Sequence, residues 1–219
     1  MKSFVIFVFL FLIILLILYF IDFPTISRCH KLKNSKSNIF FDTYKNKKKN
    51  TVDKVIVSFT TTPERIQHIT PMLNSLLDQT VKIDTIVLNI PEENKGKKYN
   101  IPKEYDDICN IYTVGKDYGK GTKYIPTLLR ENECGSKIIL LDDDHLYGKD
   151  LLEKLIKESD NNPNKCIYAS DKFSGSGGIL IKPEFIHSLT HDKCDDMWLE
   201  NNLKVDKINI VYTKNRKYM

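Results

Sequence analysis

The stretch that decides the fold is KIILLDDDHLY, residues 137–147. Residues 137–141 are apolar after the initial lysine and contain no Gly or Pro, which predicts a short buried strand. Three carboxylates, Asp142, Asp143 and Asp144, follow directly. Carboxylates at the end of a buried strand cost free energy unless a cation or a ligand compensates their charge. We therefore expect a ligand site at this strand end.

The chemistry of the acidic run points to a divalent metal. Open α/β sheets bind ligands in the crevice beyond the carboxyl ends of their strands. Hard cations such as Mn²⁺ or Mg²⁺ take oxygen ligands and bridge phosphate oxygens, so the run is well placed to hold a metal against a diphosphate. The alternative is a solvated turn before the next helix, because Asp is common in turns. The adjacent His145 is either a further ligand or, as more often with such a histidine, structural.

Strands and helices alternate on both sides of this stretch. Residues 92–107 are polar with Gly and Pro punctuation, which indicates a loop. Alternating strands and helices predict an α/β fold with a mostly parallel central sheet and helices on both faces. We expect strands at residues 55–59, 85–90, 108–114, 137–141, 167–169, 178–181 and 208–212, and helices at 66–78, 122–131, 149–158 and 195–203.

The N-terminal segment predicts a membrane anchor. Ser3 to Ile21 is free of charged residues, and such a length suits a hydrocarbon core of about 30 Å. It is too long for a signal-peptide core, and no small-residue cleavage site follows. We predict a transmembrane anchor at residues 1–21 and a Lys/Asn-rich tether at 22–53, whose composition buries too little apolar surface to fold alone. Residues 54–219 then form one compact domain.

Charge and cysteine content narrow the function. Much of the net charge of +5 lies in the tether, where lysines are either solvated or near anionic lipid. Residues 54–219 show no basic helix or stacked aromatic residues, so no nucleic-acid partner is expected. The five cysteines form no C-x-x-C pair, which indicates neither a zinc site nor a disulfide framework.

The orientation in the membrane follows from the flanking charges. Basic residues lie just after the anchor, and the positive-inside rule then favours a cytosolic catalytic domain. No N-x-S/T sequon occurs in the chain, which agrees with that side. The family resemblance described next leaves a lumenal domain open.

The chain carries four separated motifs, VIVSFTTTPER at 55–65, DYGKGTK at 117–123, DDD at 142–144 and DDMW at 195–198. Together they resemble the motifs of GT-A-fold, metal-dependent, inverting glycosyltransferases of the family-two-like type. The resemblance runs from about Lys54 to Thr213. Residues 55–65 resemble the first strand and donor-side loop, and DDD at 142–144 matches the D-x-D metal motif. DYGKGTK at 117–123 resembles the segment D-Y-G-P-x-T-K, with Lys120 where proline is usual. DDMW at 195–198 resembles the acidic pair that opens the helix bearing the catalytic base.

The resemblance implies a role for each carboxylate. Asp144 would hold the metal, with Asp142 as its partner or turned toward the nucleotide, and Asp143 would be the variable middle residue. The metal would act as a Lewis acid on the departing diphosphate. Asp196, or else Asp195, would take the proton of the acceptor hydroxyl. Simple capping of the last helix is the alternative for that pair.

The other site residues follow from the same motifs, and each has a plain alternative. In these alternatives, Lys123 is a solvated lysine on a helix, and Gly177 and Gly178 belong to a flexible turn. Thr61 and Arg65 then belong to a loop whose polar groups are hydrogen-bonded locally. Many relatives carry a further metal ligand after the base-bearing helix, and residues 214–219 offer none. The donor-binding candidates are Thr61, Arg65, Asp117, Lys123, Asp142 and Asp143, and the acceptor-side candidates are Gly177, Gly178 and Trp198.

The leading hypothesis is a glycosyltransferase that moves a sugar from a nucleotide-diphosphate donor to a hydroxyl of a glycan, lipid or protein, with inversion. One alternative is a sugar nucleotidyltransferase, but those enzymes usually carry a Gly-rich loop after the first strand, and residues 60–63 contain no glycine. The other is a non-catalytic, membrane-tethered sugar- or partner-binding module. For a transferase, we expect the acidic triplet and the Asp195–Asp196 pair to be on the order of 8–12 Å apart, with Lys123 and Gly177 bordering the cleft.

Overall fold

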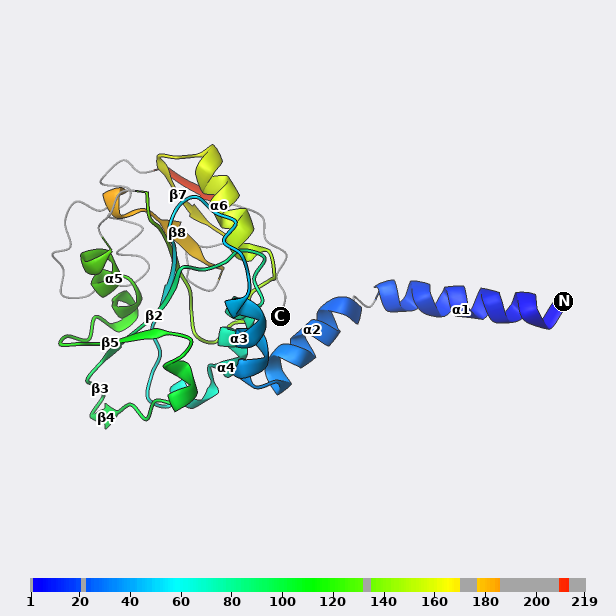
Figure 1. The fold of residues 1–219 in the computed structure, drawn as a ribbon, viewed down its shortest axis with the longest axis horizontal. Helices are drawn as coiled ribbons and strands as arrows, with labels where there is room; N and C mark the ends of the chain where they lie inside the picture. Colours follow the sequence, from blue (N-terminus) through cyan, green and yellow to red (C-terminus); the bar gives the residue numbers. More distant parts are fainter. Residues whose placement is uncertain (1, 21–22, 132–134, 170–176, 186–208, 213–219) are drawn as a thin grey trace. The chain divides into compact units, whose positions relative to one another are not determined.

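The computed structural model describes residues 2–20, 23–131, 135–169, 177–185 and 209–212 and divides the chain into two compact units, Met1–Ser35 and Lys36–Met219. The first unit consists of α1 (Lys2–Phe20) and α2 (Phe23–Asn34), and the apolar side chains along α1 are exposed (Figure 1). Within the described ranges, no single helix has both the length and the hydropathy to cross a membrane, whereas α1 and α2 do so as a bent pair, by length and composition only. The anchor stays a prediction.

The second unit is built on a seven-stranded sheet in the order β5-β2-β1-β6-β8-β7-β9. Strands β5, β2, β1 and β6 run parallel, β8 is antiparallel to β6 and β7, and β9 is parallel to β7. The expected α/β fold with a mostly parallel sheet is confirmed. The strands are β1 (Val55–Phe59), β2 (Thr85–Pro91), β5 (Asn110–Val114), β6 (Lys137–Leu140), β7 (Lys165–Tyr168), β8 (Ile179–Ile181) and β9 (Asn209–Tyr212).

Helices cover both faces of this sheet. Figure 1 shows α5 (Ile125–Arg130) on one face and α4 (Thr70–Leu77) and α6 (Leu151–Asn161) on the other. The core under α5 joins Ile125 and Leu128 to Ile56 of β1 and Ile138 of β6. Since side chains alternate between the faces of a strand, Ser58 lies on the same face of β1 as Ile56.

Proline divides two of the expected helices. The helix expected at 66–78 is a 3₁₀ turn, η1 (Ile66–His68), followed by α4, which has Pro71 in its first turn. The helix expected at 122–131 is likewise η3 (Gly119–Lys123) followed by α5, with Pro126 in the first turn of α5. Proline is tolerated at the start of a helix but not in its interior, so each helix begins again at its proline.

The segment expected to be an unfolded tether contains helices instead. In addition to α2, this segment contains α3 (Ser37–Lys45), which belongs to the second unit and packs on α4. Phe40 and Tyr44 of α3 are buried, and the Tyr44 hydroxyl donates to the carbonyl oxygen of Ile83. The compact unit therefore starts at Lys36 rather than Lys54. Two aromatic residues four positions apart give α3 an apolar stripe, which the overall Lys/Asn-rich composition conceals.

The polar stretch 92–107 is not only loop. It carries a small antiparallel hairpin of β3 (Glu93–Asn94) and β4 (Lys97–Lys98) and a 3₁₀ turn, η2 (Lys103–Tyr105). After the hairpin, the Tyr99 hydroxyl donates to the carbonyl oxygen of Thr61 at 3.0 Å. The excursion is thus tied to the loop that leaves β1. The helix expected at 195–203 lies outside the described residues.

Candidate metal centre

The acidic triplet lies at the topological switch point of the sheet. From β1 the chain proceeds outward to β2 and β5, and it then returns to β6 on the other side of β1. Open α/β sheets bind ligands in the crevice that forms beyond the carboxyl ends of strands at such a point. Here that crevice brings together the loop after β1, with Thr61 and Arg65, and the loop after β6, with residues 142–144.

Asp143 is the inward member of the triplet, and its side chain is 2% exposed. It accepts a hydrogen bond from the Thr61 hydroxyl, and its Oδ1 lies 2.8 Å from Arg65 Nη2. Burial raises the pKa of the Asp143 carboxyl, while the Thr61 hydrogen bond and the Arg65 charge act in the opposite direction. The carboxylate of Asp143 therefore joins the two loops, and its place as the variable middle residue of the motif stays a prediction.

Asp142 is held from two directions. Lys123 Nζ lies 3.1 Å from Asp142 Oδ1, and the lysine side chain is 2% exposed. The hydroxyl of buried Tyr147 accepts from the main-chain N–H of Asp142 and donates to its carbonyl oxygen, both at 2.8 Å. Lys123 is therefore a buried partner of the acidic triplet and not a solvated helix lysine.

Asp144 and His145 face outward. His145 Nδ1 lies 2.6 Å from Asp144 Oδ1, and Arg65 Nη1 lies 3.2 Å from Asp144 Oδ2. One ligand atom each from Asp142, Asp144 and His145 lie within 4.8 Å of one another. Two carboxylates and an imidazole are a donor set that Mn²⁺ accepts, and the two carboxylates alone suit Mg²⁺. The structure therefore places His145, whose role the sequence left open, in the candidate metal centre.

Asp117 builds the local fold of the segment that carries Lys123. Its Oδ1 accepts from the main-chain N–H of Gly119 at 2.7 Å and from the Thr122 hydroxyl at 3.4 Å, and its Oδ2 accepts from the Asn94 amide at 2.8 Å. Gly119 has a φ of +60°, which glycine adopts readily. These contacts of Asp117 shape the turn that precedes Lys123. The donor-binding role of Asp117 stays a prediction.

The glycines before β8 have a structural explanation. Gly178 has a φ of +91°, and a Cβ there would lie 3.2 Å from Leu141 Cδ2 and from Leu155 Cδ1. Glycine at this position therefore allows the chain to pack against the leucine side chains. The acceptor-side role of Gly177 and Gly178 stays a prediction. So do the roles of Asp195, Asp196 and Trp198 and their distance from the triplet, because these three residues lie outside the described part of the chain.

A separate recess of about 300 Å³ lies beside β5 and α5. It contains basic, aromatic and apolar side chains and includes none of the predicted site residues. Carboxylate ligands are missing among its lining residues, so it does not fit a second metal centre. The lining residues are Val114, Gly115, Lys116, Tyr118, Pro126, Leu129 and Arg130.

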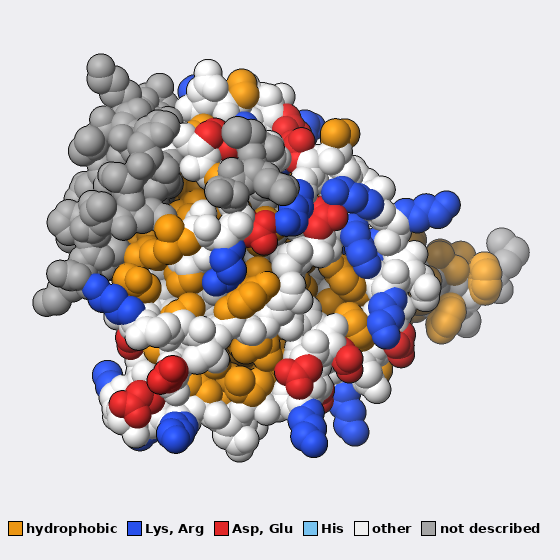
Figure 2. Space-filling view, turned by 60° about the vertical axis from the view of Figure 1, so that its left-hand side comes forward, with side chains coloured by type: hydrophobic (Ala, Val, Ile, Leu, Met, Phe, Trp, Pro, Cys, Tyr) orange, Lys and Arg blue, Asp and Glu red, His pale blue; other side chains and the backbone are white. Residues whose placement is uncertain are grey.

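The surface drawn in Figure 2 carries mixed charge. Lys and Arg side chains are interspersed with Asp and Glu side chains on that face, around apolar patches. A nucleic-acid footprint gathers basic residues into a patch or stripe on one face. The expectation that the chain has no nucleic-acid partner stays a prediction.

Comparison with known proteins supports the fold. No protein-family model and no curated protein matches the chain. Among solved structures, the chain is similar to a 4-diphosphocytidyl-2C-methyl-D-erythritol synthase, with a TM-score of 0.51 and 9% sequence identity, over 75% of this chain and 90% of that chain. At this identity the likeness shows a shared fold, a mixed α/β sheet of the GT-A-like type, and leaves the reaction undecided.

Proposed function

We propose that this chain is a metal-dependent transferase that binds a nucleotide by its phosphate chain beyond β1 and β6. The observation that carries the proposal is the cluster of Asp142, Asp144 and His145 at the topological switch point. A divalent metal there would neutralise the phosphate charge and make the phosphate group a better leaving group. Arg65 and Lys123 add fixed positive charge beside the same carboxylates.

The first candidate reaction is nucleotidyl transfer, and the comparison with solved structures supports it better than glycosyl transfer. A phosphate oxygen of a sugar phosphate would attack the α-phosphorus of a nucleoside triphosphate, and pyrophosphate would leave. The name of the structural neighbour contains a diphosphocytidyl group. The absence of glycine from residues 60–63 weighs against this reaction, because such enzymes usually carry a Gly-rich loop after the first strand.

The second candidate reaction is glycosyl transfer, and the motifs at 117–123, 142–144 and 195–198 support it. An acceptor hydroxyl on a glycan, lipid or protein would attack the anomeric carbon of a nucleotide sugar. Asp196 or Asp195 would accept the hydroxyl proton, and the nucleoside diphosphate would leave. Direct displacement of this kind inverts the anomeric centre, so an NMR spectrum of the product that shows retention would exclude the assigned base.

One experiment separates the two reactions. The full-length chain is incubated with Mn²⁺ or Mg²⁺ and either a panel of nucleotide sugars or nucleoside triphosphates paired with sugar phosphates. Mass spectrometry then identifies the products. Pyrophosphate with a new nucleotide sugar indicates nucleotidyl transfer, and a nucleoside diphosphate with a transferred or hydrolysed sugar indicates glycosyl transfer. Nucleotide binding without either product would favour the non-catalytic binding module.

We also propose that residues 1–21 anchor the enzyme in a membrane with the second unit on the cytosolic side. The exposed apolar side chains along α1 and the basic residues after it support this proposal. Protease protection of sealed vesicles tests it. A second unit that is digested only after the vesicles are opened would reverse the orientation, and a chain that stays in the supernatant would exclude the anchor.

A further inference from the structure

Two polar side chains lie in the middle of buried strands. Ser58 of β1 and Asn89 of β2 are both 0% exposed. Buried polar groups lower stability unless they are hydrogen-bonded, so both need partners inside the protein. Both find a partner in Thr127 of α5. Asn89 Nδ2 lies 2.8 Å from Thr127 Oγ1 and 3.2 Å from Ser58 Oγ. Ser58 Oγ lies 2.7 Å from Thr127 Oγ1.

The direction of each hydrogen bond follows from the number of protons. The Ser58 hydroxyl has one proton, which it donates to the main-chain oxygen of Lys123. Ser58 Oγ must therefore accept from Thr127, and the hydroxyl of Thr127 donates to it. The Asn89 amide has two protons and donates one to each hydroxyl oxygen. The three side chains thus form a complete hydrogen-bond network that ends on the backbone of Lys123.

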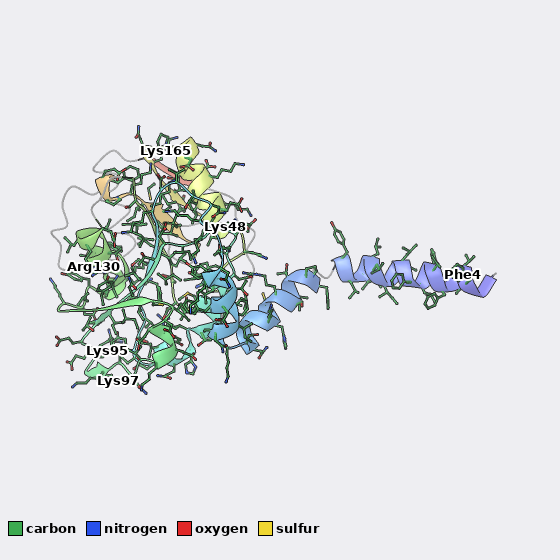
Figure 3. All side chains as sticks on the ribbon, in the orientation of Figure 1. Phe4, Lys48, Lys95, Lys97, Arg130 and Lys165 are labelled. Atoms are coloured by element: carbon green, nitrogen blue, oxygen red, sulfur yellow. The ribbon has the colours of Figure 1, made fainter. Side chains whose placement is uncertain are left out.

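The other end of the network is anchored at the edge of the sheet. Arg130, labelled in Figure 3, donates from Nη2 to Asn89 Oδ1 at 2.6 Å. Its guanidinium also lies over the ring of Tyr112 in β5, 3.8 Å from the centroid. Together these contacts fix the amide of Asn89, so that its N–H groups and not its oxygen face the two hydroxyls. A continuous series of contacts therefore runs from β5 to Lys123 and on to Asp142.

We propose that Ser58, Asn89 and Thr127 are positioning residues that hold Lys123 against Asp142 in the metal centre. The inference rests on the proposed function for the role of Asp142. Fixing the main-chain oxygen of Lys123 fixes where its side chain starts, and the Nζ then reaches one carboxylate oxygen of Asp142. A carboxylate oxygen of Asp142 lies within 4.8 Å of a ligand atom of Asp144 and of His145. Groups that do not touch the metal but orient its ligands affect metal affinity strongly.

The test uses a matched pair of substitutions at Thr127. Thr127→Val keeps the shape of the side chain and removes the hydroxyl, whereas Thr127→Ser keeps the hydroxyl. Ile167→Val, in the buried strand β7, is a control for a small loss of packing outside the network. Two quantities are measured on each folded, full-length variant: the rate at which acetic anhydride acetylates Lys123, followed by mass spectrometry without metal, and the Mn²⁺ dissociation constant, followed by electron paramagnetic resonance.

In Thr127→Val, we expect Lys123 to be acetylated faster than in the wild type and Mn²⁺ to bind about tenfold more weakly. Thr127→Ser and Ile167→Val should show the wild-type acetylation rate and the wild-type dissociation constant. If Lys123 in Thr127→Val stays as protected as in Ile167→Val, the positioning role is overturned, whatever the Mn²⁺ result. If the wild type binds no Mn²⁺, the proposed metal function fails, and acetylation of Lys123 still decides the positioning role. Should Thr127→Val fail to fold, Ser58→Ala carries the same test, because it removes the hydroxyl that donates to Lys123.

Discussion

Arg65 and Asp143 form an ion pair in which the carboxylate is buried and the guanidinium is half exposed. Arg65 Nη2 lies 2.8 Å from Asp143 Oδ1, and the two side chains are 49% and 2% exposed. They lie far apart in the chain, and they meet because β1 and β6 are adjacent parallel strands. The pair connects the loops on both sides of the switch point, and with Thr61 it offsets the cost of burying the Asp143 charge.

Replacing Arg65 by Gln should destabilise the protein. Asp143 would keep its charge in a buried position with only the Thr61 hydroxyl as a side-chain partner, and we expect a loss of about 1–3 kcal/mol, reduced from the cost of a fully buried pair by the exposure of Arg65. Urea unfolding measures the change. Lys97→Gln is the control, because the Lys97–Glu64 pair is exposed on both sides and should contribute nothing measurable. Equal effects of the two substitutions would contradict the structural role of Arg65.

Gly178→Ala should destabilise the protein more than Gly115→Ala. At Gly178 the new methyl group would meet two leucine side chains at 3.2 Å, and the φ of +91° is unfavourable for alanine. We expect a loss of about 1–3 kcal/mol for this strain. At Gly115 an added Cβ meets nothing within 4 Å, so alanine should be neutral or slightly stabilising. Urea midpoints of the two variants, compared with the wild type, test the difference. A neutral Gly178→Ala would show that the turn before β8 has room for a side chain.

The Tyr99 hydroxyl should lose its proton only at strongly alkaline pH, and the stability of the fold should therefore depend on pH in that range. Burial, together with the smaller effect of the negative charges of Asp117, Glu64 and Asp143, raises the pKa of Tyr99 to about 12. An unfolded tyrosine has a pKa of about 10. Between these values the folded state keeps a proton that the unfolded state has lost, so stability falls as the pH rises from about 10 to about 12. Tyr99→Phe lacks this contribution.

The measurement for Tyr99 is a difference. The ultraviolet absorbance of ionised tyrosine is followed from pH 9 to 12.5 in the wild type and in Tyr99→Phe, and the difference should rise with a midpoint near pH 12. In urea unfolding, the wild type should lose stability relative to Tyr99→Phe as the pH rises through this range. A midpoint near pH 10 would mean that the Tyr99 hydroxyl is not held against the loop after β1.

The strands were predictable because their patterns are local. The apolar runs of β1, β2 and β6 are free of internal Gly and Pro, and the acidic residues after β6 indicated the candidate site. The breaks at Pro71 and Pro126 also had a local signal that the helix assignment overlooked. In α3, Phe40 and Tyr44 are buried within the second unit, and the surrounding lysines and asparagines conceal that pattern in the sequence.

The contacts within the candidate site depend on residues far apart in the sequence. The burial of Asp143 depends on Thr61 and Arg65, which come from another strand end, and no local pattern reveals it. Ser58 and Asn89 did have a usable signal. Each is a polar residue inside an otherwise apolar strand, and a buried strand position of that kind requires a hydrogen-bond partner.

Asp144→Asn should remove metal binding while the fold survives. The Asp144 side chain is 50% exposed, so the substitution leaves no buried charge unpaired, but it removes a ligand from the candidate centre. In the wild type, Mn²⁺ should raise the melting temperature, because a ligand that binds only the folded state stabilises it. This rise should vanish in Asp144→Asn and shrink in His145→Gln. Transfer activity should be lost with it.

Asp150→Asn is the matched control for Asp144→Asn. Asp150 is a similarly exposed carboxylate that pairs with Lys154 four residues later in α6, outside the metal cluster. Its variant should respond to Mn²⁺ as the wild type does, since a surface carboxylate alone binds the ion weakly. A rise in melting temperature with Mn²⁺ that is equal in Asp144→Asn and Asp150→Asn would show that the ion binds elsewhere. The acidic run after β6 would then be a solvated turn, and the transferase proposal would lose the observation that carries it.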